Sequence, residues 1–332
     1  MSAAPLHGGR LLAAAEQFKI PLNDWLDLST GINPISWPVP SLPDHVWQRL
    51  PDSYAQLEAV AGDYYGAPVF AVPGSQWAIQ TLPSVLNAER VWLPQEGYEE
   101  HQYWWQQYQH RMLTYETLDN ITPQQGDCVV VINPNNPTAH TADGETLLRL
   151  ADHLATLQGH LILDEAFVDP IPQTSVFHQN HNLPDSLVVL RSLGKFFGLA
   201  GVRLGFVYCS DAIRARLQPK LGPWAVSHPA AWIGEQALQD IEWQQSTREQ
   251  LQKQQTQLHQ LLQEHVQSAS VQSTALFCTL RLPSASATAL FNHCAGRGIL
   301  LRHFPHWNKI RVGLTTPSGM ERLQSALQCW DL

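Results

Sequence analysis

Lys195 is the one lysine in a polar segment of glycines and aromatic residues that follows the apolar run Leu187–Leu190. A lysine amine forms a Schiff base with an aldehyde once desolvation or a nearby cation lowers its pKa and exposes the neutral amine. Ser192 lies three residues before this lysine and Arg203 lies eight residues after it. An arginine holds a phosphate through two parallel charge-assisted hydrogen bonds, so the stretch has groups for an aldehyde that also carries a phosphate. When this stretch is considered alone, a solvated lysine in a glycine-rich loop is the simpler interpretation of its residues.

A second candidate for anion binding lies earlier in the chain, at Gly74, Ser75 and Gln76. These residues follow the apolar run Val69–Val72 and precede an expected helix over Ala78–Leu86. A glycine turn between a strand and a helix, with a serine as the helix cap, presents free backbone N–H groups to an anion. A plain turn between strand and helix fits these residues equally well.

Further polar residues stand at the ends of other apolar runs. The runs are short and continuous, and helical patterns separate them, which predicts a mostly parallel sheet buried on both faces. Ligands of such sheets bind beyond the carboxyl ends of the strands. The residues expected to converge there are Tyr98, Asn136, Asp164, Ser192 and Lys195. The runs predicted as strands are Val69–Val72, Val91–Leu93, Cys128–Ile132, Leu161–Leu163, Leu187–Leu190 and Gly205–Tyr208.

Each converging group has a role toward pyridoxal phosphate. Asp164, buried at a strand end, requires a cationic partner such as a protonated pyridine nitrogen, and that pair keeps the ring an electron sink. Asn136 is placed to donate to the phenolic oxygen of the ring, and Tyr98 is placed to stack on the ring face. The residues predicted to hold the phosphate are Gly74, Ser75, Gln76, Ser192 and Arg203. Alternatively, Asn136 caps a turn and Asp164 caps a helix.

The order of expected strands and helices that must position these groups predicts an α/β protein. It has three layers with a mostly parallel central sheet, and a smaller α/β domain follows at the C-terminus. Residues 1–50 form an arm without a core of its own, so it is expected to lie across another domain. Residues 51–229 form the large domain. Residues 230–332 begin with one helix from Ala230 to about Val266, whose leucine stripe argues against disorder in this glutamine-rich segment. The small domain follows, with strands Ala275–Leu282, Ile299–Arg302 and Lys309–Gly313.

Composition argues against several functional classes. The net charge is -9, with 20 basic against 29 acidic residues and no basic stripe, which speaks against a nucleic-acid partner. No stretch has the length and apolar character of a membrane span or a signal peptide. The five cysteines lack the spacing of a disulfide framework, so a cytoplasmic location is expected. No metal site is expected at His303 and His306, because Pro305 disfavours a helix that would bring both rings to one face.

The motifs taken together resemble those of a known superfamily. They are Asn136-Pro137-Thr138, Asp164-Glu165-Ala166-Phe167, and Ser192 with Lys195 followed by Gly198-Leu199-Ala200-Gly201, Arg203 and Gly205. This set is similar to that of the fold-type I pyridoxal-phosphate enzymes of the class I/II aminotransferase superfamily. The resemblance implies pyridoxal 5'-phosphate as cofactor, Lys195 and Asp164 as catalytic residues, and a homodimer whose partner also contacts the N-terminal arm.

Other segments resemble the threonine-phosphate decarboxylases of cobalamin biosynthesis. They are His7-Gly8-Gly9, Ser29-Thr30-Gly31-Ile32-Asn33-Pro34, Arg49-Leu50-Pro51-Asp52, the segment from Ala230 to Asp240, and the pair Arg302 and Arg311. This resemblance implies decarboxylation of L-threonine O-3-phosphate to (R)-1-amino-2-propanol O-2-phosphate. The substrate-binding residues that it implies are His7, Gly8, Asn33, Arg302 and Arg311.

Some alternatives stay open at this point. Histidinol-phosphate aminotransferases share the same plan, so transamination is the rival reaction, and a non-catalytic cofactor-binding protein is a rival of another class. The orientation of the substrate decides which bond at Cα breaks, and either Arg302 or Arg311 can take the phosphate while the other takes the carboxylate. For Arg302, a surface salt bridge is the plain alternative.

Three residues depart from the pattern of the superfamily. Ala139 stands where glycine is usual, which is expected to alter that turn. Phe167 replaces a tyrosine that hydrogen-bonds the phenolic oxygen, so Asn136 is expected to carry more of that role. Leu50 replaces a tyrosine that reaches the neighbouring subunit's cofactor phosphate, and Tyr54 is the candidate substitute.

Overall fold

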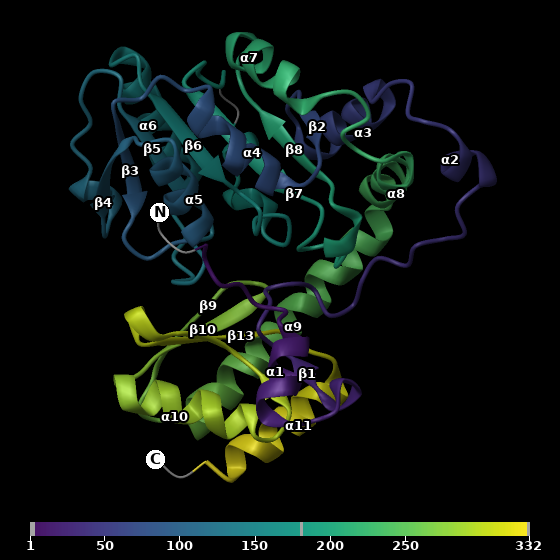
Figure 1. Ribbon diagram of the computed structural model, residues 1–332, viewed down its shortest axis with the longest axis vertical. Coiled ribbons are helices and arrows are strands. Elements are labelled where there is room, and N and C mark those ends of the chain that lie inside the picture. Colours follow the sequence, from purple (N-terminus) through teal and green to yellow (C-terminus); the bar gives the residue numbers. More distant parts are fainter. Residues whose placement is uncertain (1–3, 180–181, 331–332) are drawn as a thin grey trace. The chain divides into compact units, whose positions relative to one another are not determined.

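The computed structural model describes residues 4–179 and 182–330, which form two units (Figure 1). Unit 1 is built mainly from Trp37–Asn136 and Thr141–Gln244. Unit 2 is built mainly from Leu6–Ser36, Pro137–His140 and Gln245–Leu332. Within the described part of the chain, no helix combines the length and the apolar character needed to cross a membrane.

Unit 1 contains a seven-stranded sheet with the order β2-β8-β7-β6-β5-β3-β4. Its strands are β2 (Phe70–Val72), β3 (Arg90–Pro94), β4 (Arg111–Tyr115), β5 (Cys128–Ile132), β6 (His160–Asp164), β7 (Leu187–Ser192) and β8 (Gly205–Tyr208). The neighbouring strands β4, β3, β5, β6 and β7 pair in parallel, whereas β8 runs antiparallel to both β2 and β7. The predicted mostly parallel α/β sheet is thereby confirmed.

Helices cover both faces of this sheet, which gives the three layers. On one face lie α4 (Ser75–Thr81), α5 (Glu99–Gln107) and α7 (Asp211–Leu221), which share a core with strand residues such as Val130 and Val188. On the other face lies α6 (Gly144–Thr156), packed on the alternate strand residues such as Val129 and Val189. The side chains of β5, β6 and β7 are buried on both faces apart from His160, the first residue of β6, because successive strand residues point to opposite sides.

Helices α8 (His228–Gln239) and α9 (Ile241–His265) correct the sequence prediction of one long helix. α8 ends at Asp240, and α9 begins directly after it. The Asp240 Oδ1 accepts a hydrogen bond from the Trp243 N–H at 3.0 Å, which satisfies a free donor of the first turn of α9. The Oδ2 of the same aspartate accepts from the Trp37 indole at 3.0 Å. The remaining helices of unit 1 are α2 (Asp44–Gln48) and α3 (Ala55–Tyr65), of which α3 packs against α8.

Helix α4, which follows β2, also differs from its prediction. It begins at Ser75, not at Ala78, and it ends at Thr81. Pro83 lies in the following 3-10 turn, where it lacks the N–H that would continue the α-helix. Gly74, with φ 79, takes the cap position that was predicted for the serine, and Ser75 is the first residue of the helix.

Unit 2 contains a four-stranded antiparallel sheet in the order β12-β13-β10-β9 and a separate parallel pair, β1 with β11. The strands are β1 (Leu26–Asp27), β9 (Ser270–Ser273), β10 (Phe277–Arg281), β11 (Ile299–Leu300), β12 (Arg302–Phe304) and β13 (Lys309–Gly313). The helices are α1 (Leu11–Phe18), α10 (Ser284–Ala295), α11 (Pro317–Gln328) and most of α9. The single strand predicted over Ile299–Arg302 is two strands, because Leu300 pairs with Asp27 and Arg302 pairs with Arg311.

Candidate active site

Lys195 lies in the loop that follows β7, and the two residues after it anchor that loop. Phe196 and Phe197 are fully buried, and the Phe197 ring stacks on the Trp243 ring with centroids 5.6 Å apart and planes at 14°. Lys195 is half-buried, and its amine lies 5.3 Å from the centroid of the Phe167 ring. The lysine therefore extends from a rigid base, and Phe167, which departs from the superfamily pattern, faces its amine.

Asp164 is the last residue of β6, and its carboxylate is almost completely buried. Its Oδ2 lies 3.0 Å from the His101 Nε2, and its Oδ1 accepts from the Ala166 N–H at 3.0 Å. His101 is equally buried and belongs to α5. Sequence reasoning missed this histidine, because nothing in the spacing of α5 distinguishes a residue that meets a strand end 63 positions later.

The residues predicted to hold a phosphate come together where β2, β7 and β8 meet. Ser192 and Gly205 are register partners in the sheet, and Gly205 also pairs with Val72 just before Gly74. A Cβ on Gly205 would lie 2.5 Å from the Ser75 nitrogen, so only a glycine lets β8 come this close to α4. Ser192 also accepts from the Gly194 N–H at 3.3 Å.

Arg203 completes this group from the loop before β8. It adopts a left-handed backbone conformation with φ 58, and a Cβ on Gly74 would lie 2.7 Å from its guanidinium NH2. A side chain at position 74 would fill the space beside the guanidinium, where an anion is expected.

The side chain of Gln76 is held by two neighbours. Its Nε2 donates to the Glu100 Oε2 at 2.6 Å, and its Oε1 accepts from the Tyr98 hydroxyl at 3.1 Å. Glu100 also accepts from the Trp104 indole at 2.8 Å. The Gln76 side chain thereby links the first turns of α4 and α5, and its hydrogen bond with the Tyr98 hydroxyl holds the Tyr98 ring in place.

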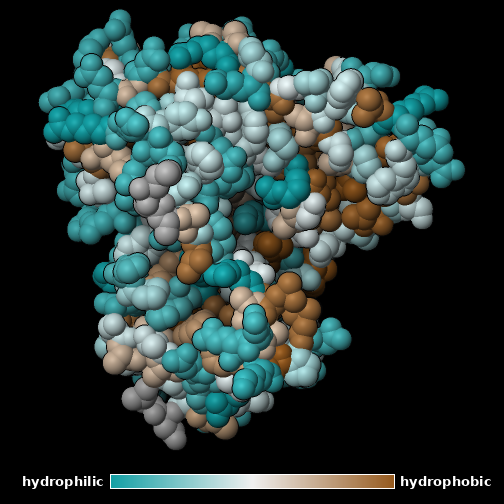
Figure 2. Space-filling view, in the orientation of Figure 1, coloured by the Kyte–Doolittle hydropathy of each residue, from teal (hydrophilic) through white to brown (hydrophobic). Residues whose placement is uncertain are grey.

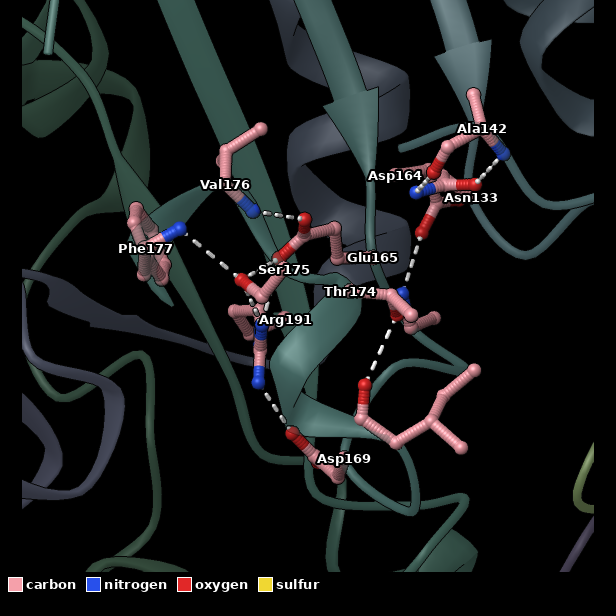
Figure 3. Close-up of polar contacts among 12 residues, drawn as sticks. Asn133, Ala142, Asp164, Glu165, Asp169, Thr174, Ser175, Val176, Phe177 and Arg191 are labelled. Carbon is pink, nitrogen blue, oxygen red and sulfur yellow. Dashed lines mark hydrogen bonds and ion pairs between the residues drawn. The ribbon is translucent and has the colours of Figure 1, made fainter. Parts of the chain in front are cut away.

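Asn136 is buried at the end of the loop after β5. Two asparagines before it hold this loop: Asn133 exchanges two hydrogen bonds with the Ala142 backbone, at 3.1 and 2.9 Å, and Asn135 donates to the Glu96 carbonyl at 2.8 Å. Figure 3 shows the contact between Asn133 and Ala142 beside the end of β6. Ala139, a few residues later, has φ 63 and so takes the left-handed conformation that favours the usual glycine.

A buried ionic cluster ties β6 to β7 next to these groups (Figure 3). Arg191 donates to the Glu165 Oε2 at 2.6 Å and to the Asp169 Oδ1 at 2.5 Å, and the Ser175 hydroxyl also donates to Glu165. Burial lowers the pKa of the Arg191 guanidinium, but the two carboxylates outweigh burial and raise that pKa overall. Glu165 follows Asp164, and Arg191 precedes Ser192, so the cluster fixes the strand ends from which the predicted cofactor residues project.

Unit 2 holds the residues predicted to bind substrate. Arg302 and Arg311 are register partners on β12 and β13. The Arg302 NH2 donates to the Leu6 carbonyl at 2.5 Å, which places His7 and Gly8 at the end of this strand pair. Asn33 is buried in the same unit, and its Oδ1 accepts from the Ile35 N–H at 2.9 Å.

A model of aminotransferases of class I and II matches residues 44–327 of the chain. The chain belongs to this family. A threonine-phosphate decarboxylase of Pseudomonas aeruginosa is 41% identical over 97% of this chain and 96% of its own. A second threonine-phosphate decarboxylase, from a Sinorhizobium species, is 40% identical over 72% of this chain and 73% of its own. Among solved structures, an L-threonine-O-3-phosphate decarboxylase of Porphyromonas gingivalis aligns with a TM-score of 0.77 at 17% identity, covering 91% of this chain and 98% of its own.

Aminotransferases of class I and II use pyridoxal 5'-phosphate, and the residues of unit 1 fit this group. Asp164 offers a buried carboxylate at a strand end, which suits a protonated ring nitrogen. The glycine at position 74 leaves room beside the Arg203 guanidinium for a phosphate. Lys195, Asp164, Asn136, Ser192 and Arg203 all belong to unit 1, whereas Arg302 and Arg311 belong to unit 2.

Proposed function

We propose that this protein decarboxylates L-threonine O-3-phosphate to (R)-1-amino-2-propanol O-2-phosphate with pyridoxal 5'-phosphate, in the biosynthesis of cobalamin. The observation that carries the proposal is the 41% identity to the threonine-phosphate decarboxylase of Pseudomonas aeruginosa along 97% of the chain. The two arginines in register on β12 and β13 support it, because a substrate with a phosphate and a carboxylate offers each of them an anion.

The roles of the site residues follow from their chemistry and belong to the same proposal. Bound pyridoxal phosphate supplies the electron sink for the electron pair left on the substrate's Cα. Asp164, oriented by His101, would hold a proton on the ring nitrogen, and Lys195 or a water would deliver a proton to Cα once carbon dioxide has left. Asn136 and Tyr98 orient the ring, while the phosphate is held by Gly74, Ser75, Gln76, Ser192 and Arg203.

Substrate orientation decides between decarboxylation and transamination. His7, Gly8, Asn33, Arg302 and Arg311 are proposed to hold the phosphate and the carboxylate of the substrate. Two anchored ends fix the rotation about Cα, so the binding energy is used to align the carboxylate bond for cleavage. We further propose the division into an arm (1–50), a large domain (51–229) and a small domain (230–332).

A homodimer in the cytoplasm is the proposed state of the enzyme. Among the described residues of unit 1, four large apolar side chains are more than half exposed, namely Trp47 (67%), Leu50 (59%), Trp224 (56%) and Ile241 (62%). Figure 2 shows apolar surface on the side of unit 1 that carries α2 and α8. Exposed apolar patches of this kind mark protein interfaces. The Tyr54 hydroxyl donates to the Val226 carbonyl and accepts from the Val226 N–H of its own chain.

The proposed reaction is tested with pure protein, pyridoxal phosphate and each candidate substrate. With L-threonine O-3-phosphate we expect one carbon dioxide per substrate consumed, and no reaction from the Lys195→Ala variant. Formation of glutamate from 2-oxoglutarate and histidinol phosphate, without carbon dioxide from phosphothreonine, would establish the rival aminotransferase. A protein that binds the cofactor but turns over neither substrate would be the non-catalytic rival.

A further inference from the structure

Ser29 is a buried residue of unit 2, 2% exposed, that connects two distant segments of this unit. Its hydroxyl accepts from the Gly9 N–H at 2.7 Å, and its carbonyl accepts from the Arg311 NH2 at 2.6 Å. Its own N–H and hydroxyl both donate to the Asp27 Oδ1, at 2.8 and 2.6 Å. One serine therefore joins the N-terminal segment to an arginine that lies 282 positions further along the chain.

The direction of these hydrogen bonds is set by Asp27. A carboxylate oxygen only accepts, so the Ser29 hydroxyl must donate its single proton to Asp27. The lone pairs of the hydroxyl oxygen are then left for the Gly9 N–H. An alanine at position 29 would remove this acceptor without removing the carbonyl that binds Arg311.

The N-terminal segment also fits Ser29 sterically. A Cβ on Gly8 would lie 2.3 Å from the Ser29 carbonyl oxygen, so the segment contacts Ser29 through glycine backbone. Two residues earlier, the Leu6 carbonyl accepts from Arg302. The segment is thus attached at Leu6, Gly8 and Gly9, and His7 lies between these attachments.

We propose that Ser29 is a positioning residue that sets the specificity for the phosphorylated end of the substrate. It holds the segment that carries His7 through the Gly9 N–H on one side and the Arg311 guanidinium on the other, in a fixed arrangement with Arg302. Groups that are ordered before a doubly charged phosphate arrives lose less freedom when they bind it. The inference rests on the proposed function, because only that function gives these residues a phosphorylated ligand.

The first test is hydrogen–deuterium exchange of the holoenzyme without substrate, comparing Ser29→Ala with wild type. We expect the Gly9 amide to exchange about tenfold faster in the variant, since one hydrogen bond of ordinary strength is lost. Peptides elsewhere in the chain should keep their protection. Ser325→Ala is the matched control, because its exposed hydroxyl bonds only within α11.

The second test measures steady-state kinetics with L-threonine O-3-phosphate. Ser29→Ala should raise KM about tenfold with little change in kcat, because the substrate's phosphate loses its ordered partners. Gly8→Ala leaves Ser29 intact but pushes the segment away from it, so the same rise in KM is expected.

Unchanged exchange at Gly9 in Ser29→Ala overturns the inference, as does a loss of protection spread over the whole chain. So does a KM equal to that of wild type in both variants. The exchange experiment needs no substrate, so wild-type protein that releases no carbon dioxide would contradict the proposed function alone.

Discussion

At the scale of single residues, each reactive group of unit 1 has a neighbour from another element: the Asp164 Oδ2 lies 3.0 Å from the His101 Nε2, and the Lys195 amine lies 5.3 Å from the centroid of the Phe167 ring. Asp164 and Lys195 stand out in the sequence because Asp164 ends an apolar strand and Lys195 lies in the loop just after one, and each carries a group that is costly to bury. His101 and Glu100 were not predicted, since each meets its partner only after α5 has packed beside a strand end or another helix. Contacts of this kind depend on tertiary packing, for which local spacing gives no signal.

Ala139 provides a test of backbone strain at one residue. Its φ of 63 costs a residue with a Cβ roughly 1–2 kcal/mol relative to glycine. We therefore expect Ala139→Gly to raise the free energy of unfolding by about 1 kcal/mol, measured by urea denaturation. Ala285→Gly in the exposed first turn of α10 should lower it by a similar amount, because glycine disfavours a helix. A lower stability of Ala139→Gly would contradict the role given to this conformation.

At the scale of elements, strand positions followed from composition, whereas breaks and edges did not. β5 and β7 are clear in the sequence because each contains a continuous run of Val, Ile or Leu, which fills both buried faces. β4 was missed because it is the edge strand, with one buried side chain at its end and a mixed sequence. The break between α8 and α9 was missed because it depends on a hydrogen bond from the Trp243 N–H to a single aspartate.

The link between β6 and β7 is expected to be strong. Arg191→Met leaves Glu165 and Asp169 as buried carboxylates without their cation, which should lower the free energy of unfolding by about 3–5 kcal/mol. Arg149→Ala removes the exposed pair with Glu145 on α6 and should cost less than about 1 kcal/mol. Urea denaturation of both variants measures the contrast, and equal losses would argue against a special role of the buried cluster.

The start of β5 predicts a dependence on pH. Burial raises the pKa of the Asp127 carboxyl, but hydrogen bonds from Arg90, the Gln124 N–H and Trp92 outweigh burial and lower that pKa overall. A carboxyl with a lower pKa in the folded state contributes stability above its unfolded pKa and loses it as the pH falls through the folded value. Unfolding free energies measured from pH 7 down to about pH 3 should therefore fall less steeply for Asp127→Asn than for wild type, from a lower starting value at neutral pH. Parallel curves would contradict this assignment.

At the scale of the whole molecule, the sequence predicted an α/β sheet and a smaller α/β region, but it did not predict how distant segments combine. Unit 2 joins Leu6–Ser36 to Gln245–Leu332 and includes the short segment Pro137–His140. The Pro137 carbonyl accepts from the Thr279 hydroxyl of β10 at 2.6 Å. No pattern in a loop of four residues indicates which unit it will join.

The proposed dimer is also tested at this scale. Trp47→Glu places a charge in the exposed apolar patch of unit 1, so we expect the dimer to dissociate at micromolar concentrations. Sedimentation velocity measures this dissociation. Tyr108→Glu at the end of α5 is the control, because Tyr108 is also a large exposed side chain of unit 1 (46%) but lies outside both this patch and the N-terminal arm. A wild-type monomer at these concentrations, or dissociation by both variants, would contradict the placement of the interface.

The close approach of β8 to α4 determines how the loop after the lysine tolerates mutation. Gly201 and Gly205 stand four positions apart in the same motif, yet a Cβ on Gly201 meets no described atom within 4 Å, whereas one on Gly205 meets three backbone atoms within 2.8 Å. In a saturation-mutagenesis library selected for cofactor binding, position 205 should therefore return glycine alone, while position 201 should return many residue types. Two glycines that look equivalent in the sequence are thus expected to differ completely in the residue types that can replace them.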